Sequence, residues 1–464
     1  MNKNHIIIFL LLVFTFVFVG CSKNNESESI KETQEETNQE SVDTAEVKGE
    51  QKAVVEGFDW GPGVTKTIVK LNKEVEKTDI NKEDFNVVEK KESFDWEKFE
   101  KDGEAPKHIV VESERTINDV YLSNENGEEV DDAKSMYLTI EFDVSPTEGN
   151  PFIYSMNTGS NNWCDPYELI IKSSNNKLKD LEINSKIDFK DDKNFIAKDI
   201  ENFEYSNFQS SEDIDMAYAY YKPSNEEKNK PLVIWLHGGG EGGKDPRTIL
   251  LANKASVFST EEFQKRFANG AHILMPQAET FWMDTGDETK SLEGVGEKSS
   301  MYKSSLKELI DKYVSENPDI DPNKIIIGGC SNGGFMTYDM ITSYKDYFAA
   351  AFPICPAYDP KFMTDEKIEN MKNTAIWMIY SLNDNTIDPE KNEIPLSRLL
   401  EEKDMKEFKE TTFDNVIDLS GKYKDEKGKP FEYNGHWSWI YAFNNDVKDE
   451  EGNNLFDWLG EKVK

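Results

Sequence analysis

The sequence predicts an α/β protein whose doubly wound, mostly parallel sheet is preceded by an all-β sandwich. Up to about residue 202, short β-rich runs alternate with turn residues, whereas after Phe203 strand-like runs alternate with helical stretches. The chain has 464 residues, and domains usually span about 100–200 residues. Two folded units with additional unstructured segments are therefore expected.

The first residues predict export from the cytoplasm. An apolar run from Ile6 to Val19 follows a short basic start and is too short for a comfortable membrane span. Cys21 follows Val19-Gly20 and resembles the acylated cysteine of bacterial lipoprotein signals, although Phe18 stands where Leu is usual. We expect residues 1–21 to be a lipoprotein signal peptide and Cys21 to anchor the protein to the bacterial cell membrane, outside the cytoplasm. A plain N-terminal anchor helix is the alternative.

The next segment and the net charge restrict the partners. Residues 22–53 are rich in Glu, Asn, Ser, Thr and Gln and predict a disordered acidic linker. The formal net charge of −36 repels phosphate groups, so it argues against nucleic acid and favours neutral or cationic substrates.

Residues 54–202 predict a β-sandwich that is immunoglobulin-like by analogy, because several short strands follow one another at regular spacing. No catalytic constellation is apparent there. The expected strands are Lys66–Leu71, Phe85–Glu89, His108–Glu112, Val120–Leu122, Met136–Phe142 and Tyr167–Ile171.

Residues 203–464 predict the parallel sheet with helices on both faces. Within Ser299–Val314, five apolar residues recur at helical spacing and form one stripe. The wholly apolar runs Leu232–Leu236 and Ile325–Ile327 are typical of central parallel strands. The other expected strands are Met216–Tyr221, His272–Met275, Ala350–Ile354 and Ala375–Tyr380.

The sharpest motif is Gly329-Cys330-Ser331-Asn332-Gly333, which lies between the strand Ile325–Ile327 and an expected helix at Phe335–Tyr344. This is the G-x-S-x-G elbow of α/β-hydrolases, in which glycines permit a tight turn and a helix start offers a backbone N–H to an oxyanion. The context predicts that Ser331 is a nucleophile.

A serine hydroxyl needs an imidazole to accept its proton. Of the five histidines, His436 alone follows Ser331, as the α/β-hydrolase order of serine, acid and histidine requires. Asp384 and Asp388 both lie just past the strand Ala375–Tyr380 and could orient His436. We prefer Asp384 because it is nearer the strand end and its S-x-x-D-x-x-I setting resembles the acid turn of many hydrolases.

An oxyanion hole is expected where Leu232–Leu236 runs into a glycine-rich loop that begins at His237. We assign the N–H of Asn332 and that of Gly239 or Gly240, and we interpret His237 as a structural residue. The same loop begins like a phosphate-binding P-loop at Gly238, but Asp245 stands where Ser or Thr should bind magnesium.

Neither a metal nor another cofactor is expected. Cys164, Cys330 and Cys355 show no metal-type spacing, and an odd number cannot all pair, so we predict small buried residues without a disulfide framework or a structural zinc.

Together these residues resemble α/β-hydrolase esterases related to the prolyl oligopeptidase and polyhydroxybutyrate-depolymerase groups. The matching stretches are Pro231–Gly243, Met275-Pro276-Gln277 with Trp282, the elbow at Ser331, and Gly435–Trp439. Gly57–Pro62 ahead of a β-domain resembles bacterial esterases with an N-terminal immunoglobulin-like domain. The resemblance implies carboxylesterase activity on short-chain or aryl esters and a β-domain packed near the active site. Our leading hypothesis is therefore an esterase, with acylated carbohydrate or aryl esters at the cell surface as substrates.

Two other functions remain open at this point. A serine peptidase would share the same elbow, but the N-terminal region is too short for a β-propeller of about four or more blades. A non-catalytic surface lipoprotein would bind glycan through its β-domain and would be indifferent to Ser331→Ala. The sequence does not specify an oligomeric state.

Overall fold

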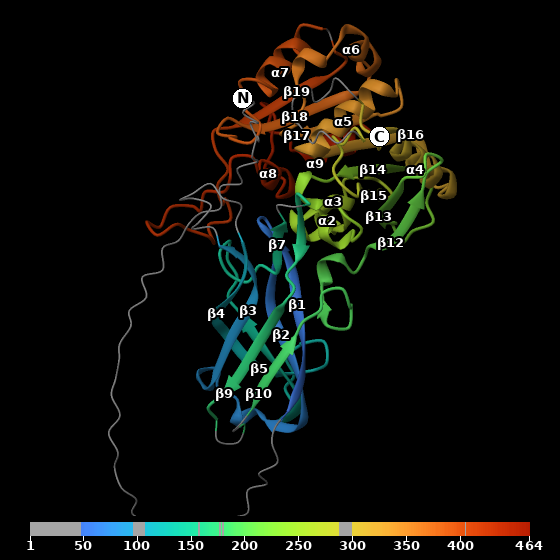
Figure 1. The fold of residues 1–464 in the computed structure, drawn as a ribbon. Coiled ribbons are helices and arrows are strands. Elements are labelled where there is room, and N and C mark those ends of the chain that lie inside the picture. The colour runs from blue at the N-terminus through green and yellow to red at the C-terminus, as the bar shows by residue number, and fades with distance from the viewer. Residues whose placement is uncertain are drawn as a thin grey trace, which may run out of the picture.

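The computed structural model describes residues 48–95, 107–155, 158–175, 178, 181–286, 299–403 and 405–464. A β-sandwich and an α/β domain follow one another along the chain and lie end to end (Figure 1). The predicted division at residues 202 and 203 lies between η3 (Lys198–Ile200) and β12 (Glu204–Gln209). The predicted signal peptide and most of the predicted linker lie outside the described residues.

The N-terminal domain is a sandwich of two sheets, as the strand spacing predicted. Its described strands pair in the orders β11-β1-β2-β6-β5 and β10-β9-β3-β4, and β7 and β8 form a separate hairpin. The strands are β1 (Gly49–Phe58), β2 (Gly61–Glu76), β3 (Phe85–Asp95), β4 (Lys107–Glu114), β5 (Ile117–Ser123), β6 (Lys134–Phe142), β7 (Phe152–Ser155), β8 (Ser160–Trp163), β9 (Tyr167–Ser173), β10 (Glu182–Lys186) and β11 (Phe195–Ile196).

The first strand corrects the predicted end of the linker. We expected disorder up to residue 53, but β1 begins at Gly49, and Gln51 and Ala53 are buried. Because Gln51 is polar although it is buried, the sequence does not show the alternation of apolar and polar residues that marks a half-buried strand. Its amide donates to the Leu169 carbonyl at 2.7 Å, and its carbonyl accepts from the Thr67 hydroxyl at 3.0 Å, which satisfies the buried group.

The α/β domain is built on a sheet of eight described strands in the order β12-β13-β15-β14-β16-β17-β18-β19. From β15 to β19 neighbouring strands run parallel, whereas β13 is antiparallel to both of its neighbours. The predicted central strands lie in the middle, and their apolar residues are buried. The remaining strands are β13 (Asp215–Tyr221), β14 (Lys230–Leu236), β15 (His272–Gln277), β16 (Ile320–Cys330), β17 (Ala350–Ile354), β18 (Ala375–Ser381) and β19 (Phe408–Phe413).

Helices cover both faces of this sheet, which confirms the doubly wound prediction. Val233 and Trp235 of β14 pack in one apolar cluster with α2, α3, α8 and α9, whereas Leu232 and Ile234 pack in a second cluster with α4, α5, α6 and α7. The first cluster continues into the core of the sandwich. The helices are α2 (Arg247–Ala252), α3 (Glu261–Gln264), α4 (Lys303–Glu316), α5 (Asn332–Ser343), α6 (Asp365–Met371), α7 (Glu393–Glu401), α8 (Trp439–Phe443) and α9 (Leu455–Glu461).

Short 3-10 helices connect several of these elements: η1 (Lys77–Asp79), η2 (Lys82–Asp84), η4 (Gly239–Glu241), η5 (Ala255–Ser259) and η6 (Pro360–Phe362). The five apolar residues of the predicted stripe on α4 are buried or nearly so: Tyr302, Leu306, Leu309, Ile310 and Tyr313. Within the described ranges, no helix is both long and apolar enough to cross a bilayer.

Candidate active site

Ser331 lies at the sharp turn between β16 and α5. Its backbone has φ 55° and ψ −114°, a strained conformation for a residue with a side chain. The turn is held because the Ser331 N–H donates to the Ile354 carbonyl at 2.8 Å and the Ser331 carbonyl accepts from Phe335 N at 2.9 Å. Ser331 thus lies at the carboxyl end of the central strand β16.

The glycines of the elbow are required by close packing. A Cβ atom on Gly333 would lie 2.0 Å from the Leu236 carbonyl oxygen, and one on Gly329 would lie 2.6 Å from both Leu236 and Gly333 backbone atoms. Because these neighbours are backbone atoms of a central strand and of the helix start, they have no room to move. The fixed glycines of the motif therefore follow from the approach of β14 to the turn.

His436 is paired with Asp384. His436 Nδ1 lies 2.6 Å from Asp384 Oδ2, and both side chains are buried. The other carboxylate oxygen of Asp384 accepts backbone N–H groups from Thr386 at 2.7 Å and Ile387 at 2.9 Å. These bonds fix the carboxylate just past β18, and an Nδ1–H donated to it leaves Nε2 of His436 as the proton acceptor.

The alternative acid, Asp388, is directed elsewhere. Its carboxylate forms an ion pair with Lys391 at 2.6 Å, and its side chain is 44% exposed. The Lys391 ammonium lowers the pKa of Asp388. The structure therefore brings His436 to Asp384 and not to Asp388.

Cys355 lies next to the Asp384–His436 pair, in a segment that is hydrogen-bonded to the elbow. Its thiol and one polar atom from each of those two side chains lie within 4.8 Å of one another. On either side of Cys355, the Ile354 carbonyl accepts the Ser331 N–H at 2.8 Å, and the Ala357 N–H donates to the Ser331 carbonyl at 3.1 Å. Burial raises the pKa of the Cys355 thiol well above its usual value, so the thiol stays neutral. The short segment around Cys355 therefore adjoins both the elbow and the pair.

Among the described residues, Cys164, Cys330 and Cys355 are buried free cysteines, as predicted. Sequence reasoning did not place Cys355 at the site. It follows β17 with a φ of 37°, and only the alignment of β17 with β16 and β18 brings it there.

Gly239 and Gly240, the two predicted oxyanion residues of the glycine loop, face different parts of the structure. A Cβ atom on Gly239 would lie 4.0 Å from the Cβ of Asn332, so Gly239 faces the start of α5. Gly240 instead faces the hairpin of β7 and β8, because a Cβ there would lie 3.0 Å from Asn161 and 3.9 Å from Tyr154. The backbone of the glycine loop therefore contacts both the elbow and the N-terminal domain.

His237 has both ring nitrogens engaged in the loop. Nδ1 lies 2.7 Å from the Gly238 carbonyl, and Nε2 accepts the Ala278 N–H at 3.1 Å. Complete burial lowers the pKa of His237 to about 4, so the ring is neutral near pH 7. These contacts fit the structural role that we inferred for it.

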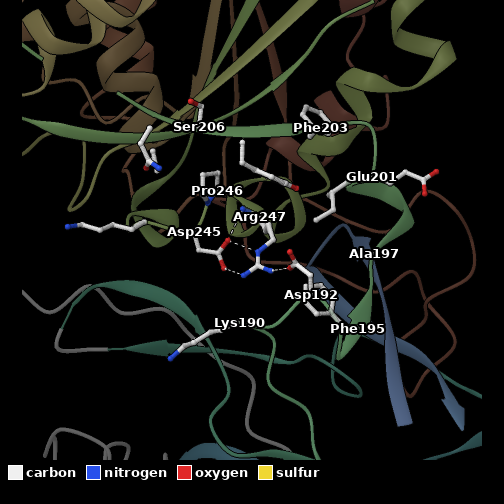
Figure 2. A pocket seen from close by; sticks show the side chains of 15 residues that line it. Lys190, Asp192, Phe195, Ala197, Glu201, Phe203, Ser206, Asp245, Pro246 and Arg247 are labelled. Carbon is white, nitrogen blue, oxygen red and sulfur yellow. Dashed lines mark hydrogen bonds and ion pairs between the residues drawn. The ribbon is translucent and has the colours of Figure 1, made fainter. Parts of the chain in front are cut away.

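The part of the loop that resembled a P-loop instead joins the two domains. Asp245 accepts from the Trp163 indole at 3.0 Å and from Arg247, and Arg247 also contacts Asp192 of the N-terminal domain. Asp192, Asp245 and Arg247 line a cleft of about 490 Å³ (Figure 2). Lys244 also lines this cleft and forms an ion pair with Glu279 at 3.1 Å. Ser331, Asp384 and His436 do not line this cleft.

The fold and this site define a class: the chain has the α/β-hydrolase fold and carries the serine, acid and histidine that serine hydrolases use. Residues 50–184 match the family model described as the esterase Ig-like N-terminal domain, and residues 223–414 match that of the phospholipase/carboxylesterase family. Two successive parts of the chain are therefore similar to an esterase immunoglobulin-like domain and to a phospholipase/carboxylesterase domain.

One curated protein is similar to a part of the chain, and one solved structure is similar to most of it. A poly(3-hydroxyalkanoate) depolymerase C from Paucimonas lemoignei is 31% identical over 140 residues, which cover 28% of this chain and 29% of the depolymerase. The chain thus matches less than a third of that relative's length. The crystal structure of a thermostable esterase superimposes with a TM-score of 0.65 at 22% identity, covering 90% of this chain and 99% of the esterase. This likeness shows that the two-domain fold is shared.

Proposed function

We propose that the protein is a carboxylesterase that forms an acyl-enzyme on Ser331. The Asp384–His436 hydrogen bond of 2.6 Å, next to a strained serine elbow, is the observation that carries this proposal. Both matching family models describe esterase domains, which supports an ester as the substrate.

The chemistry follows from the positions of the groups. His436 Nε2 accepts the proton of the Ser331 hydroxyl as Oγ attacks the ester carbonyl, and Asp384 stabilises the imidazolium that forms. Backbone N–H groups of Asn332 and of Gly239 or Gly240 stabilise the negative oxygen. The imidazolium then protonates the departing alcohol. Water attacks the acyl-enzyme after giving a proton to His436, and the acid leaves as Ser331 regains its proton.

We further propose that the substrates are short-chain or aryl esters, with acylated carbohydrate as one source. The net charge of −36 supports this, since it disfavours strongly anionic substrates. The Paucimonas relative is named for a polyester, and its similarity covers too little of either chain to extend that substrate to this protein.

Labelling with a fluorophosphonate probe tests the proposed nucleophile. Wild-type protein should form a covalent adduct on Ser331, and Ser331→Ala should form none and lose about three or more orders of magnitude in turnover of p-nitrophenyl acetate. Absence of an adduct on the wild-type protein would contradict catalysis. A proline-containing peptide substrate run alongside would reveal a peptidase instead, if it were cleaved in preference to the ester.

Export and a lipid anchor on Cys21 remain part of the proposal. The basic start, the short apolar run and the cysteine support them. In a bacterial host, Cys21→Ala should leave the protein without incorporated fatty acid and shift it out of the membrane fraction. Equal fatty-acid incorporation in both proteins would overturn the anchor.

A further inference from the structure

Glu241 is a buried carboxylate inside the glycine loop, and the proposed reaction gives it no role. It ends η4, two residues after Gly239, and is 6% exposed. Within the described residues, no Lys or Arg forms an ion pair with it, although Lys244 follows closely in the chain. A buried carboxylate without a cation needs hydrogen-bond donors, because burial otherwise destabilises its charge.

Both carboxylate oxygens of Glu241 have such donors. Oε2 accepts the Gly238 N–H at 2.6 Å, and Oε1 accepts from the Asn253 amide at 2.8 Å. Asn253 follows α2 and is itself buried, so it fixes the far end of the carboxylate. Burial raises the pKa of Glu241 to about 7, which agrees with a carboxylate held by neutral donors only.

Together with His237 and Gln277, the Glu241 carboxylate fixes the backbone of the glycine loop at several points. The Gly238 carbonyl contacts His237 Nδ1 at 2.7 Å, and the Gly238 N–H donates to Glu241. The Glu241 carbonyl in turn accepts from the Gln277 amide at 2.8 Å. Glycine has no side chain to restrict its backbone, so a loop of consecutive glycines needs external bonds of this kind to keep one conformation.

We propose that Glu241 and Asn253 form a positioning pair that aims the loop N–H of Gly239 or Gly240 at the oxyanion. This inference rests on the proposed esterase function. It assigns Glu241 no contact with substrate. The effect is on the transition state. An oxyanion-hole N–H that is slightly misplaced loses most of its stabilisation of the negative oxygen, whereas binding of the neutral substrate changes little.

Exchanging the two partners tests the pair. Glu241→Gln leaves one uncharged oxygen for the Gly238 N–H and turns an N–H₂ group toward that of Asn253, so the Asn253 amide must turn over to offer its oxygen instead. We expect kcat to fall about 10- to 100-fold with KM within about twofold, since displaced oxyanion donors cost about that much. Adding Asn253→Asp restores a donor–acceptor pair of the same total charge. The double variant should recover to within about threefold of wild type.

The readouts separate this role from a structural one. Active sites are counted with the fluorophosphonate probe, so that kcat refers to folded enzyme, and melting temperatures are recorded. Asn317→Asp is the matched control for Asn253→Asp, because Asn317 is also buried and its amide also donates a hydrogen bond, in this case to the Tyr313 carbonyl at 2.6 Å. It should lower the melting temperature without a comparable loss of kcat.

Three results would overturn the proposal: an unchanged kcat in Glu241→Gln, a double variant as impaired as Glu241→Gln alone, or a loss confined to KM. If the double variant does not fold, Asn253→Ala decides, and it should lower kcat about threefold or more. An inactive, unlabelled wild-type protein would instead refute the esterase function itself.

Discussion

At the scale of single residues, the two candidate acids differ in what surrounds them. Asp384 is buried against His436 and holds two backbone N–H groups, whereas Asp388 is half exposed and paired with Lys391. Asp384→Asn should lower kcat about 10³- to 10⁴-fold, because the imidazole then loses the partner that fixes its tautomer. Asp388→Asn, the matched control, should retain activity within about twofold. Steady-state hydrolysis of p-nitrophenyl acetate measures both, and a larger loss in Asp388→Asn would reverse the assignment.

His237 gives the stability of the fold a pH dependence. Its pKa of about 4 in the folded protein is below the usual 6.5, so between these values the unfolded chain binds a proton that the folded chain does not. This histidine's contribution to stability therefore falls as the pH drops from about 6.5 to about 4, by about 3 kcal/mol in all.

The variant His237→Asn keeps an amide near the Gly238 carbonyl but does not titrate. It should be less stable than wild type at pH 7 because the Ala278 N–H loses its acceptor. Relative to wild type it should gain about 3 kcal/mol on acidification to pH 4, measured by urea unfolding at both pH values. Parallel pH profiles for the two proteins would show that His237 does not titrate in this window.

The residues of the site were predictable to different degrees. Ser331, Asp384 and His436 follow from a motif and from chain order, which depend on local sequence and topology. The partners of Glu241 and the place of Cys355 depend on how separate strands and helices align, and no local pattern encodes that alignment. Asn161 lies in the other domain, so its contact with Gly240 had no signal in the sequence.

At the scale of elements, the strand–turn–helix unit around Ser331 depends on the close approach of Gly333 to the Leu236 carbonyl of β14. Gly333→Ala would place the methyl carbon 2.0 Å from the Leu236 carbonyl oxygen if nothing moved. Leu236 belongs to the central strand β14, whose backbone cannot easily shift. We expect a loss of soluble protein, or of about 100-fold or more in turnover, since the helix start must move to relieve the overlap. Gly57→Ala is the control, because its Cβ would meet only ordinary contacts at 3.7–3.8 Å. Soluble yield and turnover report both effects, and a fully active Gly333→Ala protein would contradict the packing explanation.

The elements that the sequence did not reveal are mostly edge strands and short strands. β12 and β19 form the two edges of the large sheet and carry polar or half-exposed residues, so they lack the apolar run of a central strand. β7 and β8 have four residues each, too few to show an alternation. The buried central strands were predictable because both of their faces are covered, which requires apolar side chains at consecutive positions in the middle of each strand.

At the scale of the whole molecule, the N-terminal domain touches the catalytic domain near both halves of the site. Asn161 and Tyr154 face Gly240 of the oxyanion loop. Trp60, in the turn between β1 and β2, packs edge-on against Tyr423 with ring centroids 4.6 Å apart, and it stacks near Tyr433. Tyr433 lies three residues before His436, so the turn of the sandwich packs against the loop that carries the proposed base.

This arrangement predicts that Trp60→Ala affects catalysis as well as stability. Removing a buried indole costs about 3–5 kcal/mol, and the loop before His436 loses the surface on which it packs. We expect kcat to fall about tenfold at 25 °C in protein that is still folded, because a displaced imidazole transfers protons poorly. Ile171→Ala is the control: it removes a fully buried side chain from β9 inside the sandwich and should cost about 2–5 kcal/mol without changing kcat of the folded protein. Kinetics normalised to fluorophosphonate-reactive sites compare the two variants. Equal kcat values would mean that the sandwich stabilises the enzyme without positioning His436.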